Sequence, residues 1–359
     1  YAKLIKNGII KFIRVIYVKN KKTKTFIFNF LIFLGLILIM YFIIFRKVNI
    51  KDILNSLKSV NLIYIFLAFI ATFIYISLET VNVGRILNNF GYNKKPLTYL
   101  KYTMIGYFFS AITPSSSGGQ PMQIYYMKKD DIDISHSTFA LLVQLSGYQF
   151  SVVLIALISL IFSFNYVRSL DAIIVFLFIV GFIINFTLFV LYTLLIFKNS
   201  FVKKISNFCI KLLRKINLKN INKIEDKINE KINIFHESSN YIKENKMVVI
   251  KSFVTCIIQV LINYIGPYLI YKSFGFSENS LWLFISMQAI LFICVSFVPI
   301  PGSVGASEAG FLGVYQFLFP ASYLSSAMLL SRGISFYLFV LITGIVVIVS
   351  HYKIIKNKK

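Results

Sequence analysis

The sequence predicts an all-α polytopic membrane protein with about six full spans and two opposed re-entrant broken-helix hairpins. Of the 359 residues, 57% are hydrophobic and only 14% are charged, a composition outside the range of water-soluble domains. Apolar runs of about 20 residues, the length that crosses a bilayer core of about 30 Å, recur along the chain. Two further apolar segments run into clusters of Pro, Gly and Ser, which break helices.

The full spans follow from the uninterrupted apolar runs. They are expected near residues 26–45, 62–83, 137–164, 172–197, 248–271 and 321–350. The basic start at residues 1–25 resembles the beginning of a signal peptide, but the run that follows is too long and lacks a small-residue cleavage site. We therefore expect residues 26–45 to be a retained span.

The charge distribution sets the expected orientation. Lys and Arg outnumber Asp and Glu by 38 to 13, which gives a formal charge of +25. In a soluble protein this excess would suggest nucleic acid as a partner. Here the basic residues gather before residue 26, between residues 198 and 251, and after residue 352. The positive-inside rule places these blocks, and hence both termini, in the cytoplasm, and no nucleic-acid partner is expected.

The two interrupted segments cover residues 97–127 and 281–319. If the first crossed the membrane once, the basic block at 198–251 would lie outside, against the positive-inside rule. Re-entrant hairpins that enter from opposite sides keep every basic block inside. The chain then divides into a basic N-terminus (1–25), a first membrane half (26–197), a basic amphipathic loop (198–247), a second membrane half (248–350) and a basic tail (351–359).

The two halves share a plan, which suggests an inverted repeat. Each contains a broken hairpin followed by a long span, and both breaks read Pro-x-x-x-Gly, at residues 114–118 and 301–305. Opposed helices interrupted by Gly and Pro are typical of transporters with a site near the bilayer midplane. The alternative is that the breaks are simple turns between short packed helices.

Irregular backbone at membrane depth is tolerated only where protein or a water-filled cavity satisfies its polar groups. We therefore expect the breaks, with the helix N-termini that follow them, to bind a lipid headgroup. The candidate headgroup-binding residues are Thr113, Ser115, Ser116, Ser117, Gly118, Gly119, Gln120, Ser303, Gly305, Ser307, Glu308 and Arg332.

Ionisable side chains within spans are energetically costly and are usually functional or paired. Glu308 and Arg332 lie on neighbouring elements, so they are expected either to form an ion pair that holds the break or to contact the headgroup. Candidate cavity residues are Glu79, Arg85, Gln144 and Gln259. The amides among them have the alternative role of bonding between helices.

Other chemistries are weakly represented. The three Cys and three His residues are widely separated, so no metal site is expected, and the sequence contains no nucleotide-binding motif and implies no cofactor. Asp130, Asp131 and Asp133 are expected to cap the next helix rather than to hold Mg²⁺. The loop at 201–245 has apolar residues at helical spacing and is expected to form an amphipathic helix or helical hairpin, packed on the bundle or, as its charge favours, on anionic headgroups.

Two segments carry a family resemblance. Ile112-Thr-Pro-Ser-Ser-Ser-Gly-Gly-Gln-Pro121 and Val298-Pro-Ile-Pro-Gly-Ser-Val-Gly-Ala-Ser-Glu-Ala-Gly310 resemble the transmembrane region of lysylphosphatidylglycerol synthase/flippase proteins. Full-length members also carry a cytosolic aminoacyltransferase domain, to which nothing in these residues corresponds. The resemblance therefore implies a stand-alone translocating member of the bacterial inner membrane, and argues against an enzyme although the family name implies phosphatidylglycerol lysyltransferase.

The expected function is that of a flippase for an anionic or aminoacylated phospholipid such as lysyl-phosphatidylglycerol. By resemblance, its activity would contribute to antimicrobial peptide resistance, and a separate lipid-modifying enzyme would supply the cargo. The residues leave the oligomeric state open. They also leave two alternatives: a membrane-embedded lysyltransferase-type or other lipid-phosphate transferase, and a non-catalytic membrane scaffold.

Overall fold

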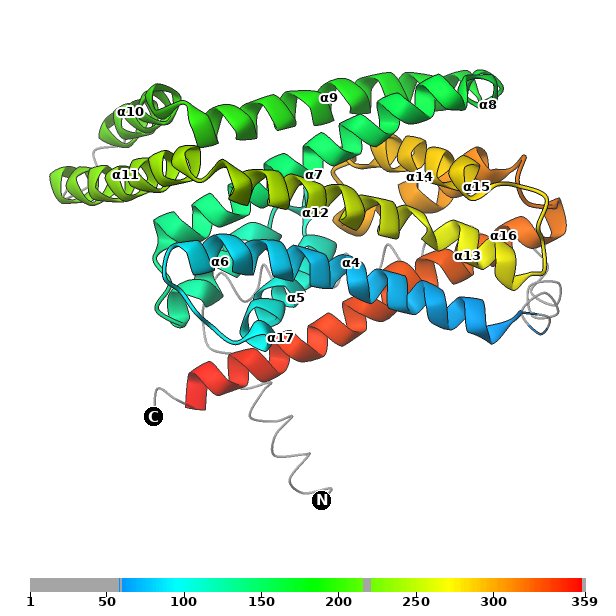
Figure 1. Ribbon diagram of the computed structural model, residues 1–359, viewed down its shortest axis with the longest axis horizontal. Helices are drawn as coiled ribbons and strands as arrows, with labels where there is room; N and C mark the ends of the chain where they lie inside the picture. Colours follow the sequence, from blue (N-terminus) through cyan, green and yellow to red (C-terminus); the bar gives the residue numbers. More distant parts are fainter. Residues whose placement is uncertain (1–57, 59, 216–220, 357–359) are drawn as a thin grey trace.

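The computed structural model describes residues 58, 60–215 and 221–356, and within these residues it is all-helical with no strand (Figure 1). The predicted all-α fold is therefore confirmed. The elements are α4 (Leu62–Asn89), α5 (Pro96–Ile112), η1 (Pro114–Ser116), α6 (Gly119–Lys129), α7 (Ile134–Phe162), α8 (Phe164–Arg168), α9 (Ala172–Phe197), α10 (Asn199–Lys215), α11 (Ile221–Glu244), α12 (Lys246–Tyr264), α13 (Gly266–Ser273), α14 (Leu281–Val295), η2 (Pro301–Ser303), α15 (Ala306–Tyr315), α16 (Ala321–Arg332), η3 (Gly333–Tyr337) and α17 (Leu338–Lys356).

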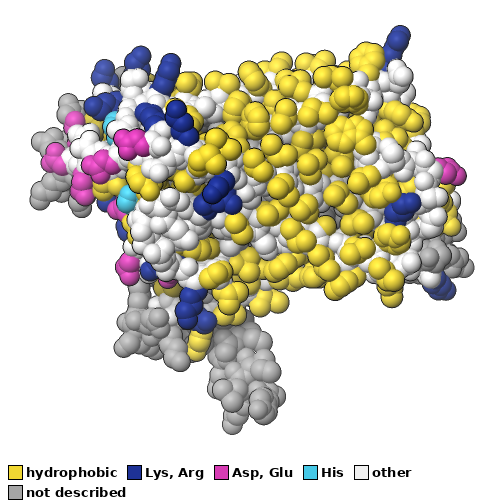
Figure 2. Space-filling model, in the orientation of Figure 1, with side chains coloured by type: hydrophobic (Ala, Val, Ile, Leu, Met, Phe, Trp, Pro, Cys, Tyr) yellow, Lys and Arg dark blue, Asp and Glu magenta, His cyan; other side chains and the backbone are white. Residues whose placement is uncertain are grey.

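Five helical segments are long and apolar enough to cross a membrane. They cover Leu62–Asn89, Ile134–Phe162, Ala172–Phe197, Lys246–Ser273 and Ala321–Ile354. Five of the six predicted spans are thus confirmed, while the span expected at residues 26–45 lies outside the described residues. Figure 2 shows a broad apolar face beside a charge-rich end. The protein is a multi-pass membrane protein.

The first interrupted segment folds back on itself. Helix α5 ends at Ile112, η1 turns the chain, and α6 returns along α5. The two helices pack closely because two glycines lie between them. A Cβ atom on Gly106 would lie 1.9 Å from Gln123 Nε2, and one on Gly119 would lie 2.1 Å from Ser110 Oγ. Side chains at these positions would push the pair apart.

The second interrupted segment has the same plan. Helix α14 leads through η2 into α15, and α15 packs back against α14. A Cβ on Gly310 would lie 2.6 Å from Leu291 Cδ1. Stacked and edge-to-face rings of Phe284, Phe311, Tyr315 and Phe319 fix α15 against α14.

The two hairpins extend towards each other from opposite ends of the bundle. Figure 1 shows α5 and α6 in the half that carries α10 and α11, and α14 with α15 in the other half. Their tips, η1 and η2, are in contact. This opposed arrangement is the one that the positive-inside argument requires. The depth of each hairpin in a bilayer, the inverted repeat and the domain boundaries stay predictions.

The segment after α9 consists of the two helices α10 and α11, which pack on each other. Helix α11 also contacts α7: Lys231 Nζ lies 2.6 Å from Asp133 Oδ2, and Ser135 Oγ donates to the carbonyl of Lys231 at 2.9 Å. Of the three aspartates expected to cap α7, Asp133 does so, because its Oδ1 accepts from the Ser135 amide at 2.7 Å, whereas Asp130 binds Lys101. Packing on the bundle is therefore observed, and contact of these helices with headgroups stays a prediction.

Candidate functional site: a cavity between the two helix breaks

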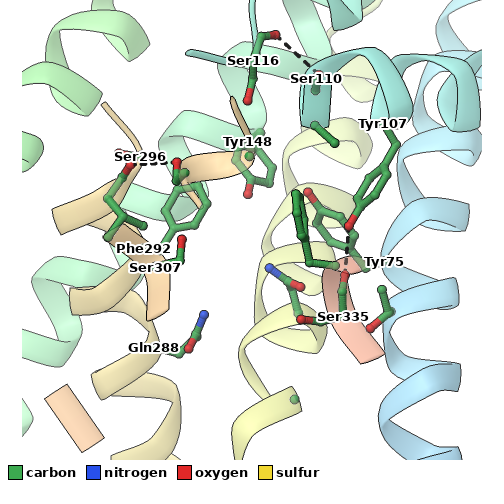
Figure 3. Close-up of a pocket in the computed structure, with 18 of the residues that line it drawn as sticks. Tyr75, Tyr107, Ser110, Ser116, Tyr148, Gln288, Phe292, Ser296, Ser307 and Ser335 are labelled. Carbon is green, nitrogen blue, oxygen red and sulfur yellow. Dashed lines mark hydrogen bonds between the residues drawn. The ribbon is translucent and has the colours of Figure 1, made fainter. Parts of the chain in front are cut away.

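A cavity of about 720 Å³ lies where the two breaks meet. Ser115 and Ser116 of the first break and Gly302 and Ser303 of the second line it, together with residues of α4, α5, α7, α14 and α16. Figure 3 shows labelled side chains from several of these elements around one space. The cavity joins segments of the two breaks that are almost 190 residues apart in sequence.

The first break is held by hydroxyl groups. Thr113 Oγ1 accepts from the Gly118 amide at 2.9 Å and donates to the carbonyl of Phe109 at 2.6 Å, so one side chain bridges both ends of the turn. Ser115 and Ser116 have positive φ angles of 49° and 54°. Such conformations cost on the order of 1 kcal/mol or more for residues other than glycine, and strain of this kind gathers at ligand sites.

The second break is held by a buried carboxylate. Glu308 Oε2 accepts from the Gly305 amide at 2.6 Å, which caps the start of α15. Its other oxygen accepts from Arg332 Nε at 2.8 Å and from the Tyr337 hydroxyl at 2.9 Å. Arg332 also donates to the carbonyl of Gly302 at 3.1 Å. The predicted ion pair is therefore present, and it joins η2, α15 and α16.

Although it is paired, Arg332 still faces the cavity. Its side chain is 16% exposed, against 2% for Glu308, and it is among the residues that line the space. Its guanidinium lies over the ring of Phe336, 4.2 Å from the centroid. The stacked, ion-paired guanidinium is thus held in one orientation at the cavity wall.

The segment from α16 to η3 bonds to both hairpins. Between α16 and α17 the chain forms a π-helical turn, η3, a feature that frequently occurs at functional sites. The carbonyl of Ser335 in this turn accepts from the Tyr107 hydroxyl of α5 at 2.9 Å (Figure 3). Because Arg332 and Tyr337 bind Glu308, the same segment bonds to α5 on one side and to α15 on the other.

The rest of the wall mixes amides, hydroxyls and aromatic rings. Gln123 Nε2 donates to Glu79 Oε1 at 3.2 Å, and Asn185 Nδ2 donates to Ser296 Oγ at 2.8 Å. Tyr315 donates to Gln288 Oε1 at 2.8 Å, which orients that amide. The rings of Tyr75, Tyr107, Tyr148, Phe292 and Phe336 supply apolar surface. A wall of this kind suits an amphipathic ligand with a polar head.

The structure divides the predicted site residues into two groups. Those that line the cavity are Glu79, Ser115, Ser116, Gln120, Gln144, Ser303, Ser307 and Arg332. Those outside the lining are Thr113, Ser117, Gly118, Gly119, Gly305, Glu308, Arg85 and Gln259. Several of the second group shape the breaks, as the contacts of Thr113 and Glu308 show.

Arg85 and Gln259 belong to a polar network behind the wall. Asn82 Nδ2 donates to Gln144 Oε1 at 2.5 Å, and Gln144 Nε2 donates to Gln259 Oε1 at 2.9 Å. Arg85 donates to Asn82 Oδ1 at 2.9 Å and to Thr255 Oγ1 at 3.1 Å. These contacts join α4, α7 and α12, so the amides here bond between helices, the alternative role considered from the sequence.

Sequence reasoning missed several residues that line the cavity, among them Tyr75, Tyr107, Tyr148, Asn185, Ser296 and Ser335. A helical-spacing signal was present for two of them. Tyr75 precedes Glu79 by four residues, and Tyr148 follows Gln144 by four. Residues four apart share a helix face, so the predicted polar residues identified the faces on which these tyrosines lie.

Two comparisons place the chain among known proteins. A family model described as the lysylphosphatidylglycerol synthase TM region matches residues 26–343. A UPF0104 membrane protein of Archaeoglobus fulgidus is 24% identical over 322 residues, which cover 88% of this chain and 94% of that protein. The chain therefore belongs to the lysylphosphatidylglycerol synthase TM region family, a family of membrane proteins linked to lipid handling.

Proposed function

We propose that the protein is a lipid translocase that passes the headgroup of an anionic or aminoacylated phospholipid through the cavity between the two breaks. The observation that carries the proposal is the space of about 720 Å³, lined by both polar and aromatic side chains, where two opposed hairpins meet inside an apolar bundle. Ligand pockets usually have volumes of about 300–1,000 Å³, so a headgroup fits this space while its acyl chains stay in the bilayer.

The charges of the wall suit a headgroup that must bind and then leave. Arg332 offers guanidinium donors to a phosphate, while Glu79 offers a carboxylate to an ammonium group. Because Glu308 already neutralises Arg332, a phosphate would compete with an existing ion pair. Binding would therefore be weak enough to be reversible, as transport requires.

The same proposal assigns the cellular setting. The basic ends would lie in the cytoplasm of a bacterial inner membrane, and the cargo would travel to the outer leaflet. For an aminoacylated lipid such as lysyl-phosphatidylglycerol, a separate lipid-modifying enzyme would supply the substrate. Export of that lipid lowers the negative charge of the surface and would increase resistance to cationic antimicrobial peptides.

Reconstitution tests the proposal directly. Full-length protein is placed in phosphatidylcholine vesicles that contain a headgroup-labelled phosphatidylglycerol, and loss of the label to a membrane-impermeant quencher is followed over time. We expect protein-dependent exchange between leaflets that falls at least about tenfold when the cavity is filled by Ser116→Phe with Ser303→Phe. Ser200→Phe, on the exposed surface of α10, is the matched control and should leave exchange unchanged.

Other outcomes of this assay would replace the proposal. A covalently modified lipid, detected by mass spectrometry and dependent on an added aminoacyl or phosphoryl donor, would identify a transferase. If protein shown to be folded gives no exchange and no modified lipid, a non-catalytic scaffold would be favoured.

A further inference from the structure

A second hollow, of about 570 Å³, lies between α5, the end of α6 and α17. It shares no lining residue with the cavity between the breaks. Four lysines line it: Lys95 at the start of α5, Lys101 six residues further on, Lys129 at the end of α6 and Lys353 near the end of α17. Different residues of the first hairpin thus line two concave sites of different character.

The second hollow carries a net positive charge. Asp130 is the one carboxylate in its lining, and it binds Lys101 and the hydroxyl of Tyr102, the latter at 2.6 Å. Lys95, Lys129 and Lys353 are exposed, and none of them forms a salt bridge within the part of the chain that the structure describes. Three ammonium groups around one concavity repel each other and attract an anion.

Apolar side chains stand beside the lysines. Leu97 is 77% exposed and Val349 is 47% exposed, and both belong to the lining. Tyr352, next to Lys353 on α17, is 67% exposed. A site for a soluble phosphate has no need of exposed leucine and valine, whereas a lipid presents a phosphate and acyl chains together.

The position of the hollow agrees with this chemistry. Lys353 lies near the end of the apolar segment Ala321–Ile354, where a spanning helix meets the membrane surface. Lys95 lies directly before the first residue of α5, and α5 packs along α17. Lysines at such ends reach the headgroup level of a bilayer.

From these observations we infer that the hollow between α5, α6 and α17 docks an anionic phospholipid. Lys95, Lys129 and Lys353 bind the phosphodiester, and the acyl chains run beside Leu97 and Val349. The inference does not depend on translocation, because docking is an equilibrium property of this site and requires no passage through the cavity. It predicts a preference for anionic over zwitterionic lipids.

Lipid retention tests the inference. Full-length protein is equilibrated with vesicles of phosphatidylglycerol and phosphatidylcholine, extracted in mild detergent, and its bound lipids are counted by native mass spectrometry. The triple variant Lys95→Gln, Lys129→Gln, Lys353→Gln should bind phosphatidylglycerol about 100-fold more weakly, given the usual contribution of each lysine near an anionic membrane. The variant Lys203→Gln, Lys246→Gln, Lys251→Gln changes the charge equally at exposed positions outside the hollow and should retain it.

Two further arms make the outcome decisive. The triple Lys→Arg variant at positions 95, 129 and 353 keeps the charge and should retain phosphatidylglycerol, which excludes misfolding as the cause of a loss. Glycerophosphate added at the same concentration as phosphatidylglycerol should not displace the bound lipid. Equal loss in both glutamine variants would reduce the effect to general surface charge. Full displacement by glycerophosphate would assign the hollow to a soluble anion, and either result would overturn the inference.

Discussion

The two helix breaks have the same Pro-x-x-x-Gly spacing but are stabilised by different chemistry. At the second break a buried carboxylate, Glu308, binds the Gly305 amide, Arg332 and Tyr337. At the first break the corresponding bridge is a single hydroxyl, that of Thr113. The serines beside it are exposed, whereas Glu308 is buried.

This difference suggests different roles in the proposed translocation. The second break is fixed by an ion pair and an aromatic cluster before any ligand arrives. The first presents hydroxyl groups on a backbone with two serines at positive φ, Ser115 and Ser116, against one, Ser303, at the second break. A rigid frame that offers a guanidinium, opposite a serine-rich turn, lets a headgroup be bound and passed on.

The largest effect is expected at the buried ion pair. Glu308→Gln leaves the Arg332 guanidinium without its carboxylate, and removal of one partner from a buried pair costs about 3–5 kcal/mol. The free energy of unfolding in detergent is the measurement. Ser117→Ala at the first break is the control and should change it by less than about 0.5 kcal/mol. Similar stability of the two variants would refute the proposed difference between the breaks.

A smaller loss of unfolding free energy is expected from Gly302→Ala. The added Cβ would lie 2.3 Å from Phe336 Cζ and 3.2 Å from the carbonyl of Ala111, at a residue with φ of 60°. Overpacking and strain together should lower the unfolding free energy by about 1–3 kcal/mol. Because Phe336 also stacks on Arg332, headgroup exchange in vesicles should fall as well. An unchanged unfolding free energy would mean that the tips do not pack as described.

An increase in unfolding free energy, opposite to the two losses above, is expected from Ser115→Gly at the first break. Glycine adopts the φ of 49° found there without steric cost, so the variant should gain up to about 1 kcal/mol of stability. The same unfolding assay measures the gain. A loss of stability would show that the Ser115 side chain contributes more than its backbone conformation costs.

The smallest effect concerns an ion pair far from both breaks, between Asp133 and Lys231. Burial raises the pKa of Asp133, but hydrogen bonds from Lys231 and the Ser135 amide outweigh it and leave the pKa below its ordinary value. The hydrogen bond that Lys231 donates to Asp133 raises the pKa of Lys231. The stability that ionised Asp133 contributes is therefore present above about pH 4 and is lost as pH falls through its lowered pKa. The stability that protonated Lys231 contributes is lost only above about pH 10.

Hydrogen exchange of α11 measures this contribution. Asp133→Asn should raise exchange slightly at neutral pH and should remove the change in protection that the wild type shows below about pH 4. The effect should be at most about 1 kcal/mol, because the Lys231 side chain is 40% exposed. If Asp133→Asn destabilised as much as Glu308→Gln, burial would not explain the difference between the two pairs.

The sequence predicted the elements of the fold better than the contacts between them. Pro, Gly and Ser located both breaks to within a few residues, since these residues disfavour continued helix. The pairing of Glu308 with Arg332 was also foreseen as one of two roles. By contrast, the turn η3 carries no signal in Gly333-Ile-Ser-Phe-Tyr337, and its bond from Tyr107 depends on tertiary packing.

The placement of Arg85 and Gln259 behind the cavity shows why the site was harder to predict. Spans that are apolar on nearly all faces do not reveal how each helix is rotated about its axis. For example, Gln144 faces the cavity while its hydrogen-bond partner Gln259 does not, and the sequence did not distinguish the two. Composition predicts that such amides are buried, and only packing decides which of them meets a ligand.

If headgroups pass between the two breaks, reversible blocking of that space should stop their exchange between leaflets. Ser116→Cys places a thiol on the cavity wall, and Ser200→Cys places one on the exposed surface of α10. Headgroup exchange is measured in vesicles before and after treatment with a bulky reagent that forms a disulfide with the introduced thiol, and again after that disulfide is reduced. We expect that modification at position 116 abolishes exchange, that reduction restores it, and that modification at position 200 leaves exchange unchanged. Exchange that continues with position 116 fully modified would contradict this expectation.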